Sequence, residues 1–242
     1  MAGKLIIIEA GDGSGKATQT ARLRERLARE GYPVRQVEYP NYQSPSSALI
    51  KMYLGGEFGS DPGAVNPYAA SAFYAVDRYA SFKKDWEEFY RRGGIVIADR
   101  YTTSNMVHQA VKIEDPMAKE SFLEWLEDFE FAKCGLPAPD GVIFLDVPPD
   151  FTRALIEKRS RETTANQDIH EQNQDYLVAC HRNALLVARK YHWFRVACVA
   201  ENRLRSIDDI HEEVYELVRQ MLAGIPACDG GGTGKDGPLI DK

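Results

Sequence analysis

The sequence lacks the features that mark secreted, membrane-bound or zinc-binding proteins. Its four cysteines are scattered at positions 134, 180, 198 and 228, with no Cys-x-x-Cys pair and no His/Cys grouping at zinc spacing. The longest apolar runs, such as Leu5–Ile8 and Val142–Leu145, are far too short to span a bilayer. The N-terminus shows no apolar stretch or cleavage site of a signal peptide. We therefore expect a cytoplasmic protein with reduced thiols and no membrane partner.

An excess of basic residues is also absent. The formal net charge of −6 argues against a general nucleic-acid binder, whose surface is usually basic. It leaves room for a local basic pocket that binds a small anion. With 242 residues, 44% hydrophobic and 27% charged, the chain is long enough for one large domain with a buried core.

Apolar runs and helical periodicity alternate along the chain, which predicts an α/β fold. The expected strands are residues 4–9, 34–39, 95–98, 141–146 and 194–199. The expected helical stretches are 16–30, 46–54, 67–90, about 104 onward, 117–131, 151–158, 174–191 and 207–222. This alternation predicts a five-stranded parallel sheet flanked by helices on both faces. Residues 1–223 are expected to form one domain, and the glycine-rich residues 224–242 a flexible tail.

A glycine-rich segment joins the first strand to the first helix. Residues 10–18 read Ala-Gly-Asp-Gly-Ser-Gly-Lys-Ala-Thr, and this context is the one that a phosphate-binding loop needs. Glycines let backbone amides turn toward phosphate oxygens, and the helix N-terminus adds its positive dipole end. The alternative is a glycine-rich turn with an incidental lysine. The expected donor-site residues are Asp12, Gly13, Ser14, Gly15, Lys16, Ala17 and Thr18.

Two positions of this loop depart from the usual Gly-x-x-x-x-Gly-Lys-Ser/Thr pattern. Ala10 stands in place of the first glycine, which is a mild change if its φ is negative. Ala17 replaces the hydroxyl that normally binds Mg²⁺, so a direct metal ligand is lost. Thr18 is adjacent but points elsewhere on the helix.

A second basic motif, Asp99-Arg100-Tyr101, follows the third predicted strand. Ligands of open parallel sheets bind beyond the carboxyl ends of the strands, so this motif should lie near the phosphate loop. The planar guanidinium of Arg100 suits an acceptor phosphate, because it can bind two oxygens at once. Asp99 could hold Mg²⁺ through water or orient Arg100. The alternative is a purely structural ion pair.

Together these motifs resemble the thymidylate kinase family, and the resemblance extends over residues 4–222. It rests on Glu9, Asp12 and Lys16, and on Asp99-Arg100-Tyr101 followed by Ser104 and His108-Gln109. It implies a P-loop NTPase-type nucleoside monophosphate kinase with a lid segment, acting on ATP and dTMP with Mg²⁺. It also implies a homodimer packed through helices.

The resemblance further implies an acceptor site. In the helix around Phe73-Tyr74-x-x-x-Arg78, Tyr74, or alternatively Phe73, would lie on thymine, with Arg78 near the base edge. Tyr42 follows Pro40 where the family often has a phosphate-binding arginine. Asp12 would lie beside the sugar 3′-hydroxyl, and adenine near residues 201–205. The residues expected on the nucleoside side are Asn105, His108 and Gln109.

The predicted lid covers about residues 158–172. Arg159 or Arg161 would supply the transition-state cation, a group worth about 10³–10⁵ in rate. Ile169 stands where the family has an arginine. Two alternatives remain at this stage. One is a P-loop kinase for another nucleoside monophosphate or a deoxynucleoside. The other is a nucleotide-binding protein that has lost catalysis, which Ala17, Ile169 and Tyr42 would favour.

Overall fold

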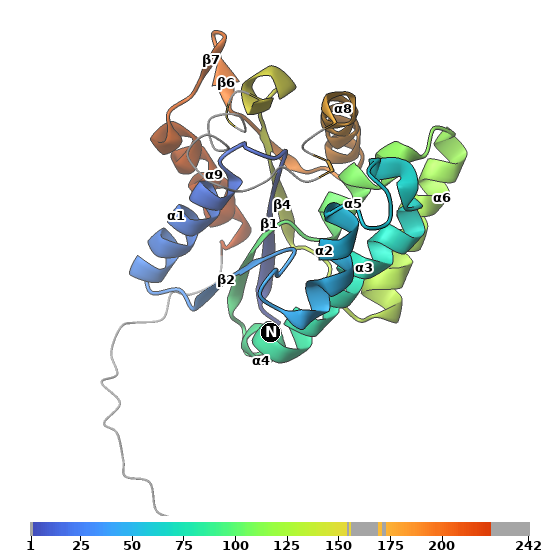
Figure 1. Cartoon of the computed structure of the whole chain (residues 1–242). Coiled ribbons are helices and arrows are strands. Elements are labelled where there is room, and N and C mark those ends of the chain that lie inside the picture. Colours follow the sequence, from blue (N-terminus) through green and yellow to red (C-terminus); the bar gives the residue numbers. More distant parts are fainter. Residues whose placement is uncertain (1, 154, 156–168, 171–172, 224–242) are drawn as a thin grey trace, which may run out of the picture.

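The computed structural model describes residues 2–153, 155, 169–170 and 173–223. Its centre is a five-stranded sheet in the order β2-β3-β1-β4-β5 (Figure 1), in which all neighbouring strands are parallel. The strands are β1 (Lys4–Ala10), β2 (Val34–Glu38), β3 (Ile95–Asp99), β4 (Gly141–Asp146) and β5 (Phe194–Ala197). The predicted fold class is therefore confirmed.

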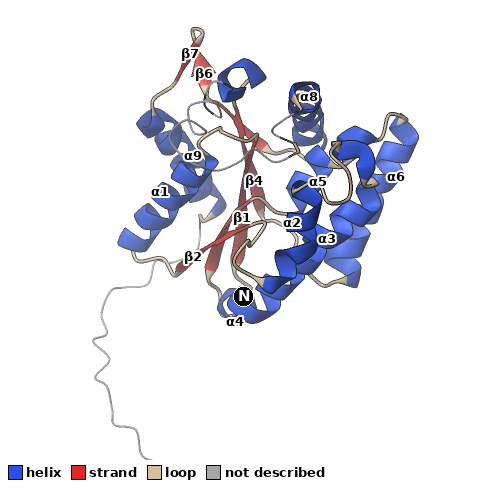
Figure 2. Cartoon of the chain, in the orientation of Figure 1, coloured by secondary structure: helices blue, strands red, loops and turns tan. Residues whose placement is uncertain are grey.

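Helices cover both faces of this sheet, and Figure 2 shows the strands as one layer between them. One face carries α1 (Lys16–Arg29) and α9 (Ile207–Met221). The helices on the other side are α2 (Ala48–Leu54), α3 (Pro67–Ser81), α4 (Glu87–Arg91), α5 (Thr102–His108), α6 (Pro116–Glu127) and α8 (Gln174–Lys190). Short 3₁₀ turns lie at Pro45–Ser47, Pro62–Ala64 and Ala110–Lys112, and residues 149–153 and 155 are helical.

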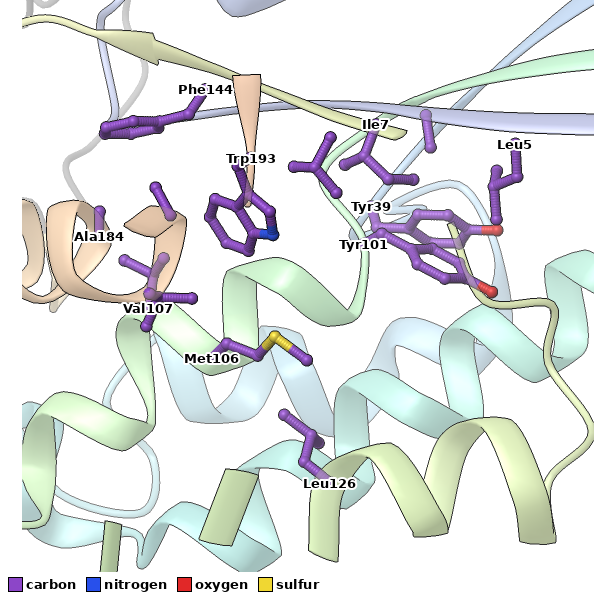
Figure 3. Close-up of a cluster of buried hydrophobic side chains, with 14 of the residues drawn as sticks. Leu5, Ile7, Tyr39, Tyr101, Met106, Val107, Leu126, Phe144, Ala184 and Trp193 are labelled. Carbon is purple, nitrogen blue, oxygen red and sulfur yellow. The ribbon is translucent and has the colours of Figure 1, made fainter. Parts of the chain in front are cut away.

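Alternate side chains of β1 enter two separate cores, as the two-residue period of a strand requires. Ile6 and Ile8 pack with Leu23 of α1 and Val214 of α9. The neighbouring residues of the strand, Leu5 and Ile7, project toward α5 and α6 (Figure 3). Because both faces are covered, β1, β3 and β4 read as continuous apolar runs.

Two helical stretches that the sequence predicts as continuous are interrupted by π-helical turns. The stretch 67–90 contains one at Phe82–Trp86, between α3 and α4, where the two terminal rings pack with centroids 4.7 Å apart. The stretch 117–131 contains another at Asp128–Lys133, after α6, with the Cys134 N–H bonded to the Phe129 carbonyl at 2.9 Å. Apolar periodicity does not reveal such a local change of pitch.

The fifth predicted strand, residues 194–199, is shorter than expected. β5 ends at Ala197, and the next residues form a hairpin of β6 (Val199–Ala200) and β7 (Arg203–Leu204) that projects from one edge of the molecule (Figure 1). Its turn residues Glu201 and Asn202 have φ values of 49° and 56°, as a type I′ hairpin turn requires. The expected loop at 201–205 therefore includes a hairpin.

Two further expectations concern thiols and membranes. Cys134, Cys180 and Cys198 are free thiols, in agreement with the sequence. Within the described ranges, none of the helices combines the length and apolar character needed to cross a membrane.

Candidate active site

The phosphate loop lies between the end of β1 and the start of α1. Gly13 and Gly15 have φ values of 74° and 80°, in the left-handed region that favours glycine. The φ of Ala10 is not positive, so its methyl group fits in place of the usual glycine. The Ser14 hydroxyl donates to the Gly11 carbonyl at 2.6 Å and closes the turn.

The loop lysine points toward the end of the neighbouring strand β3. Lys16 Nζ lies 3.5 Å from Asp99 Oδ1. Ala17 and Thr18 are exposed on the first turn of α1. Across the described residues, no cluster of three or more His, Cys, Asp or Glu side chains could hold a metal ion unaided. Among the described carboxylates, Asp99 is the one that forms an ion pair with the loop lysine.

Arg100 joins this edge of the sheet to the phosphate loop. Its backbone φ of 66° is unusual for a residue with a side chain. Nη2 contacts Asp12 Oδ1 at 2.5 Å, and Nη1 lies 3.4 Å from Glu9 Oε1 and 3.2 Å from Ser104 Oγ. Thr103 and Ser104 donate to the other oxygen of Glu9. Burial alone would raise the pKa of Asp12, but the charges of Arg100 and Lys16 outweigh it and lower that pKa.

A pocket opens beside Arg100 and collects nearly all of the acceptor residues predicted from the sequence. The predicted residues that line it are Asp12, Tyr42, Tyr74, Arg78, Arg100, Asn105, His108 and Gln109. Phe73 is not among its lining residues. It packs instead near Phe58, with ring centroids 6.0 Å apart, and against the cluster that contains Ile50 and Leu54. Of the two aromatic candidates on α3, Tyr74 is the one that lines the pocket.

The other lining residues were not predicted as substrate contacts, although Tyr101 and Ser104 belong to the motif around Arg100. They are Tyr39, Pro40, Leu54, Tyr101, Ser104 and His170. His170 stacks on His108, with ring centroids 5.9 Å apart and an interplanar angle of 4°. Its Nε2 lies 2.8 Å from the Tyr53 hydroxyl. These partners are 62 and 117 residues distant in sequence, so no local pattern could reveal the pair.

Both histidines are held in the neutral form. His108 Nε2 lies 3.3 Å from Arg100 Nη1, and a guanidinium can only donate, so this nitrogen must accept. Burial and then the charge of Arg100 lower the pKa of His108 well below its ordinary value. Burial and then Lys112 lower the pKa of His170 to about 4.

Arg78 reaches the pocket from α3 but is fully buried. Its guanidinium forms a two-point ion pair with Glu130, at 2.7 Å and 2.5 Å. Nothing in the sequence near Arg78 indicates Glu130, because it lies 52 residues away in the π-helical turn after α6.

The predicted lid lies largely outside the described residues. Arg159 and Arg161 fall in that part, so their predicted role stays a prediction. Ile169 and His170 are described, and Ile169 is only 6% exposed. It packs against Ile50 and Leu54 of α2, and its N–H bonds to the Leu54 carbonyl at 3.3 Å. This position therefore serves packing rather than phosphate binding.

Comparison with known proteins agrees with this geometry. A family model described as thymidylate kinase matches residues 8–214. The chain belongs to the thymidylate kinase family. A probable thymidylate kinase of Thermococcus onnurineus is 31% identical over 220 residues, covering 90% of this chain and 98% of the relative. One from Pyrococcus horikoshii is 30% identical over 226 residues, covering 93% and 100%.

A solved structure of the same family shows a related fold. The thymidylate kinase of Candida albicans superposes with a TM-score of 0.65 at 21% sequence identity, covering 90% of this chain and 92% of that one. The family membership inferred from the loop and from the Asp-Arg-Tyr motif is thus confirmed.

Proposed function

We propose that this protein is a dTMP kinase that transfers the γ-phosphoryl group of ATP to dTMP. The observation that carries the proposal is the bond between Asp12 and Arg100. It brings the cation suited to an acceptor phosphate onto the loop suited to the donor phosphates. The acceptor is already an anion, so no strong general base is needed, and catalysis rests on positioning and charge neutralisation. Lys16 and the loop amides hold ATP, and Arg100 holds the phosphate of dTMP.

The balance of charge indicates that further cations complete this site. In the part of the chain that the structure describes, Lys16 and Arg100 face the carboxylates of Glu9, Asp12 and Asp99. The neutral histidines add no positive charge. Two nucleotides would bring several more negative charges. We therefore assign the missing positive charge to Mg²⁺ and to Arg159 or Arg161.

The residues near the loop fit a magnesium ion that arrives with the nucleotide. Mg²⁺ is usually held by one or two carboxylates, substrate phosphates and waters. Asp99 offers one carboxylate beside Lys16, whereas Ala17 has no oxygen to offer. When bound, the ion would neutralise phosphate oxygens during transfer. Asp99 would hold it directly or through water.

The remaining pocket residues would bind the nucleoside. Tyr74 presents the ring on α3 that can stack on a base, and Asn105 lines the same wall. Gln109 Oε1 is buried and has no hydrogen-bond partner among the described residues, so it can accept from an N–H of the ligand. Asp12 lies where it can meet both Arg100 and a sugar hydroxyl. Tyr42 offers its hydroxyl near the acceptor phosphate.

A homodimer is part of this proposal. Val76 and Tyr79 of α3 are 55% and 45% exposed, on a helix whose opposite side forms the pocket wall. Packing two copies through this helix would cover them and brace Tyr74 and Arg78. We also propose a cytoplasmic enzyme with one catalytic domain, residues 1–223. The tail predicted at 224–242 lies outside the described residues.

A panel of acceptors tests this function. With ATP and Mg²⁺, we expect ADP release to depend on dTMP and to exceed that with dCMP, UMP or thymidine. Preference for one of those acceptors would overturn the substrate assignment. Binding of ATP and dTMP without turnover would instead support a nucleotide-binding protein without catalysis, which the absent hydroxyl at Ala17 favours.

A further inference from the structure

The deep end of the acceptor pocket contains a buried ion pair. Arg78 is 1% exposed and Glu130 is 0% exposed. Nε and Nη2 of Arg78 donate to the two oxygens of Glu130, and Nη1 donates to the Tyr101 carbonyl at 3.3 Å. Thr102 Oγ1 also donates to Glu130 Oε2, at 2.7 Å. The carboxylate is therefore itself held from a second helix.

These bonds leave part of Arg78 available to a ligand. A guanidinium has five N–H groups, and the contacts to Glu130 and Tyr101 use three. Among the described residues, none accepts from the other two, and Arg78 lines the pocket. Because Glu130 neutralises its charge, this end suits an uncharged hydrogen-bond acceptor, whereas Arg100 suits the phosphate.

The backbone that carries Glu130 is irregular at this point. Glu130 lies in the π-helical turn Asp128–Lys133, and the Leu136 N–H then bonds to the Glu130 carbonyl at 3.0 Å. Such turns cost stability relative to a regular helix and often occur at functional sites. Here the change of pitch brings the carboxylate onto the guanidinium and the Thr102 hydroxyl.

We propose that Glu130 is a positioning residue that sets the base specificity of the acceptor site, an inference that rests on the proposed function. Arg78 can only donate, and Glu130 holds it in one orientation, so the base must present a carbonyl oxygen at this point. Thymine carries two carbonyl groups, and cytosine has an amino group in place of one of them. An amino group facing Arg78 would place donor against donor and leave both unpaired, a mismatch that proteins reject strongly.

A double-mutant cycle on dTMP binding tests this role. The variants are Glu130→Gln, Arg78→Met and the pair, with Glu127→Gln, one turn earlier, as the matched control. We expect Glu130→Gln to weaken dTMP binding by at least about 10-fold and to leave ATP binding unchanged. The double variant should bind dTMP no more weakly than Arg78→Met alone, because Glu130 acts through Arg78. Glu130→Gln should also lower the ratio of kcat/KM for dTMP to kcat/KM for dCMP.

Two results would overturn the inference. One is wild-type dTMP affinity in Glu130→Gln, and the other is additive effects in the cycle, which a merely structural carboxylate would give. If Glu130→Gln fails to fold, Thr102→Val takes its place, since it keeps both charges. It should weaken dTMP binding by about 3-fold with ATP binding unchanged, and unchanged dTMP binding would refute the proposal. Failure of the wild-type protein to bind dTMP would refute the proposed function instead.

Discussion

Lys16 of the phosphate loop lies 3.5 Å from Asp99, the residue that precedes Arg100. Parallel pairing of β1 with β3 makes this contact possible, because it brings the carboxyl ends of the two strands together. Donor and acceptor groups thereby share one edge of the sheet.

The loop lysine should be essential, whereas its alanine neighbour should tolerate a hydroxyl. We expect Lys16→Ala to abolish turnover with the fold retained by circular dichroism. Ala17→Ser adds the usual Mg²⁺ ligand at an exposed position, so the Mg²⁺ concentration for half-maximal rate should fall. A rate unaffected by Lys16→Ala would place the donor site elsewhere.

Arg100 should contribute mainly to kcat/KM for dTMP. We expect Arg100→Ala to lower it by about 10²–10³-fold, because a preorganised cation is removed from the transferring group. Arg100→Lys keeps the charge and loses the planar fork, so it should recover only part of the activity. Steady-state kinetics at fixed ATP measures both variants, and near wild-type values for Arg100→Ala would contradict the assignment.

Ile169 should behave as a core residue. Placing a charge in its apolar site by Ile169→Arg should cost about 3 kcal/mol or more of unfolding free energy. Ile169→Val, which removes one methylene, should cost about 1 kcal/mol. Urea unfolding compares the two. A stable and faster Ile169→Arg variant would show that this position faces the phosphates.

The free energy of unfolding should fall on acidification because His170 is buried in its neutral form. The pKa of His170 is lowered from 6.5 to about 4, so between these values the unfolded chain binds more protons than the folded one. The free energy of unfolding therefore decreases as the pH falls through this window, by up to about 3 kcal/mol from this group. Urea unfolding at pH 7 and pH 4.5 measures the loss. His170→Gln should show a smaller loss, and an equal one would exclude His170 as the cause.

The exposed face of α3 should hold the dimer together. We expect sedimentation to give a dimer for the wild-type protein and a monomer for Val76→Glu, because a buried carboxylate without a partner opposes association. Lys84→Glu changes the charge of an exposed residue in the π-helical turn after α3 and serves as the control. A wild-type monomer would refute the dimer.

Much of this architecture was predictable because its determinants are local. A buried strand, a turn and a helix are predicted within a few residues by the run Leu5–Ile8 and the glycines before Lys16. The motif Asp99-Arg100-Tyr101 lies at a strand end, where topology fixes its neighbours. The parallel sheet and the phosphate loop follow from such signals.

The contacts that refine the site are distant in sequence. Glu130 meets Arg78 across 52 residues, and His170 meets Tyr53 across 117. Neither the Glu130 carboxylate nor the His170 imidazole lies in a local sequence motif that indicates its role. Ile169 stands where the family resemblance implies a cation, but its surroundings make it part of an apolar cluster. Only the packed structure distinguishes these meanings.

The bond between Asp12 and Arg100 also has a thermodynamic consequence. Asp12 belongs to the loop proposed for ATP, and Arg100 is the group proposed for dTMP. A ligand that changes the strength of this bond in one site changes the binding free energy in the other. Such coupling is reciprocal, so the factor by which ATP alters dTMP affinity equals the factor by which dTMP alters ATP affinity. The two substrates would thus act as effectors of each other through one ion pair.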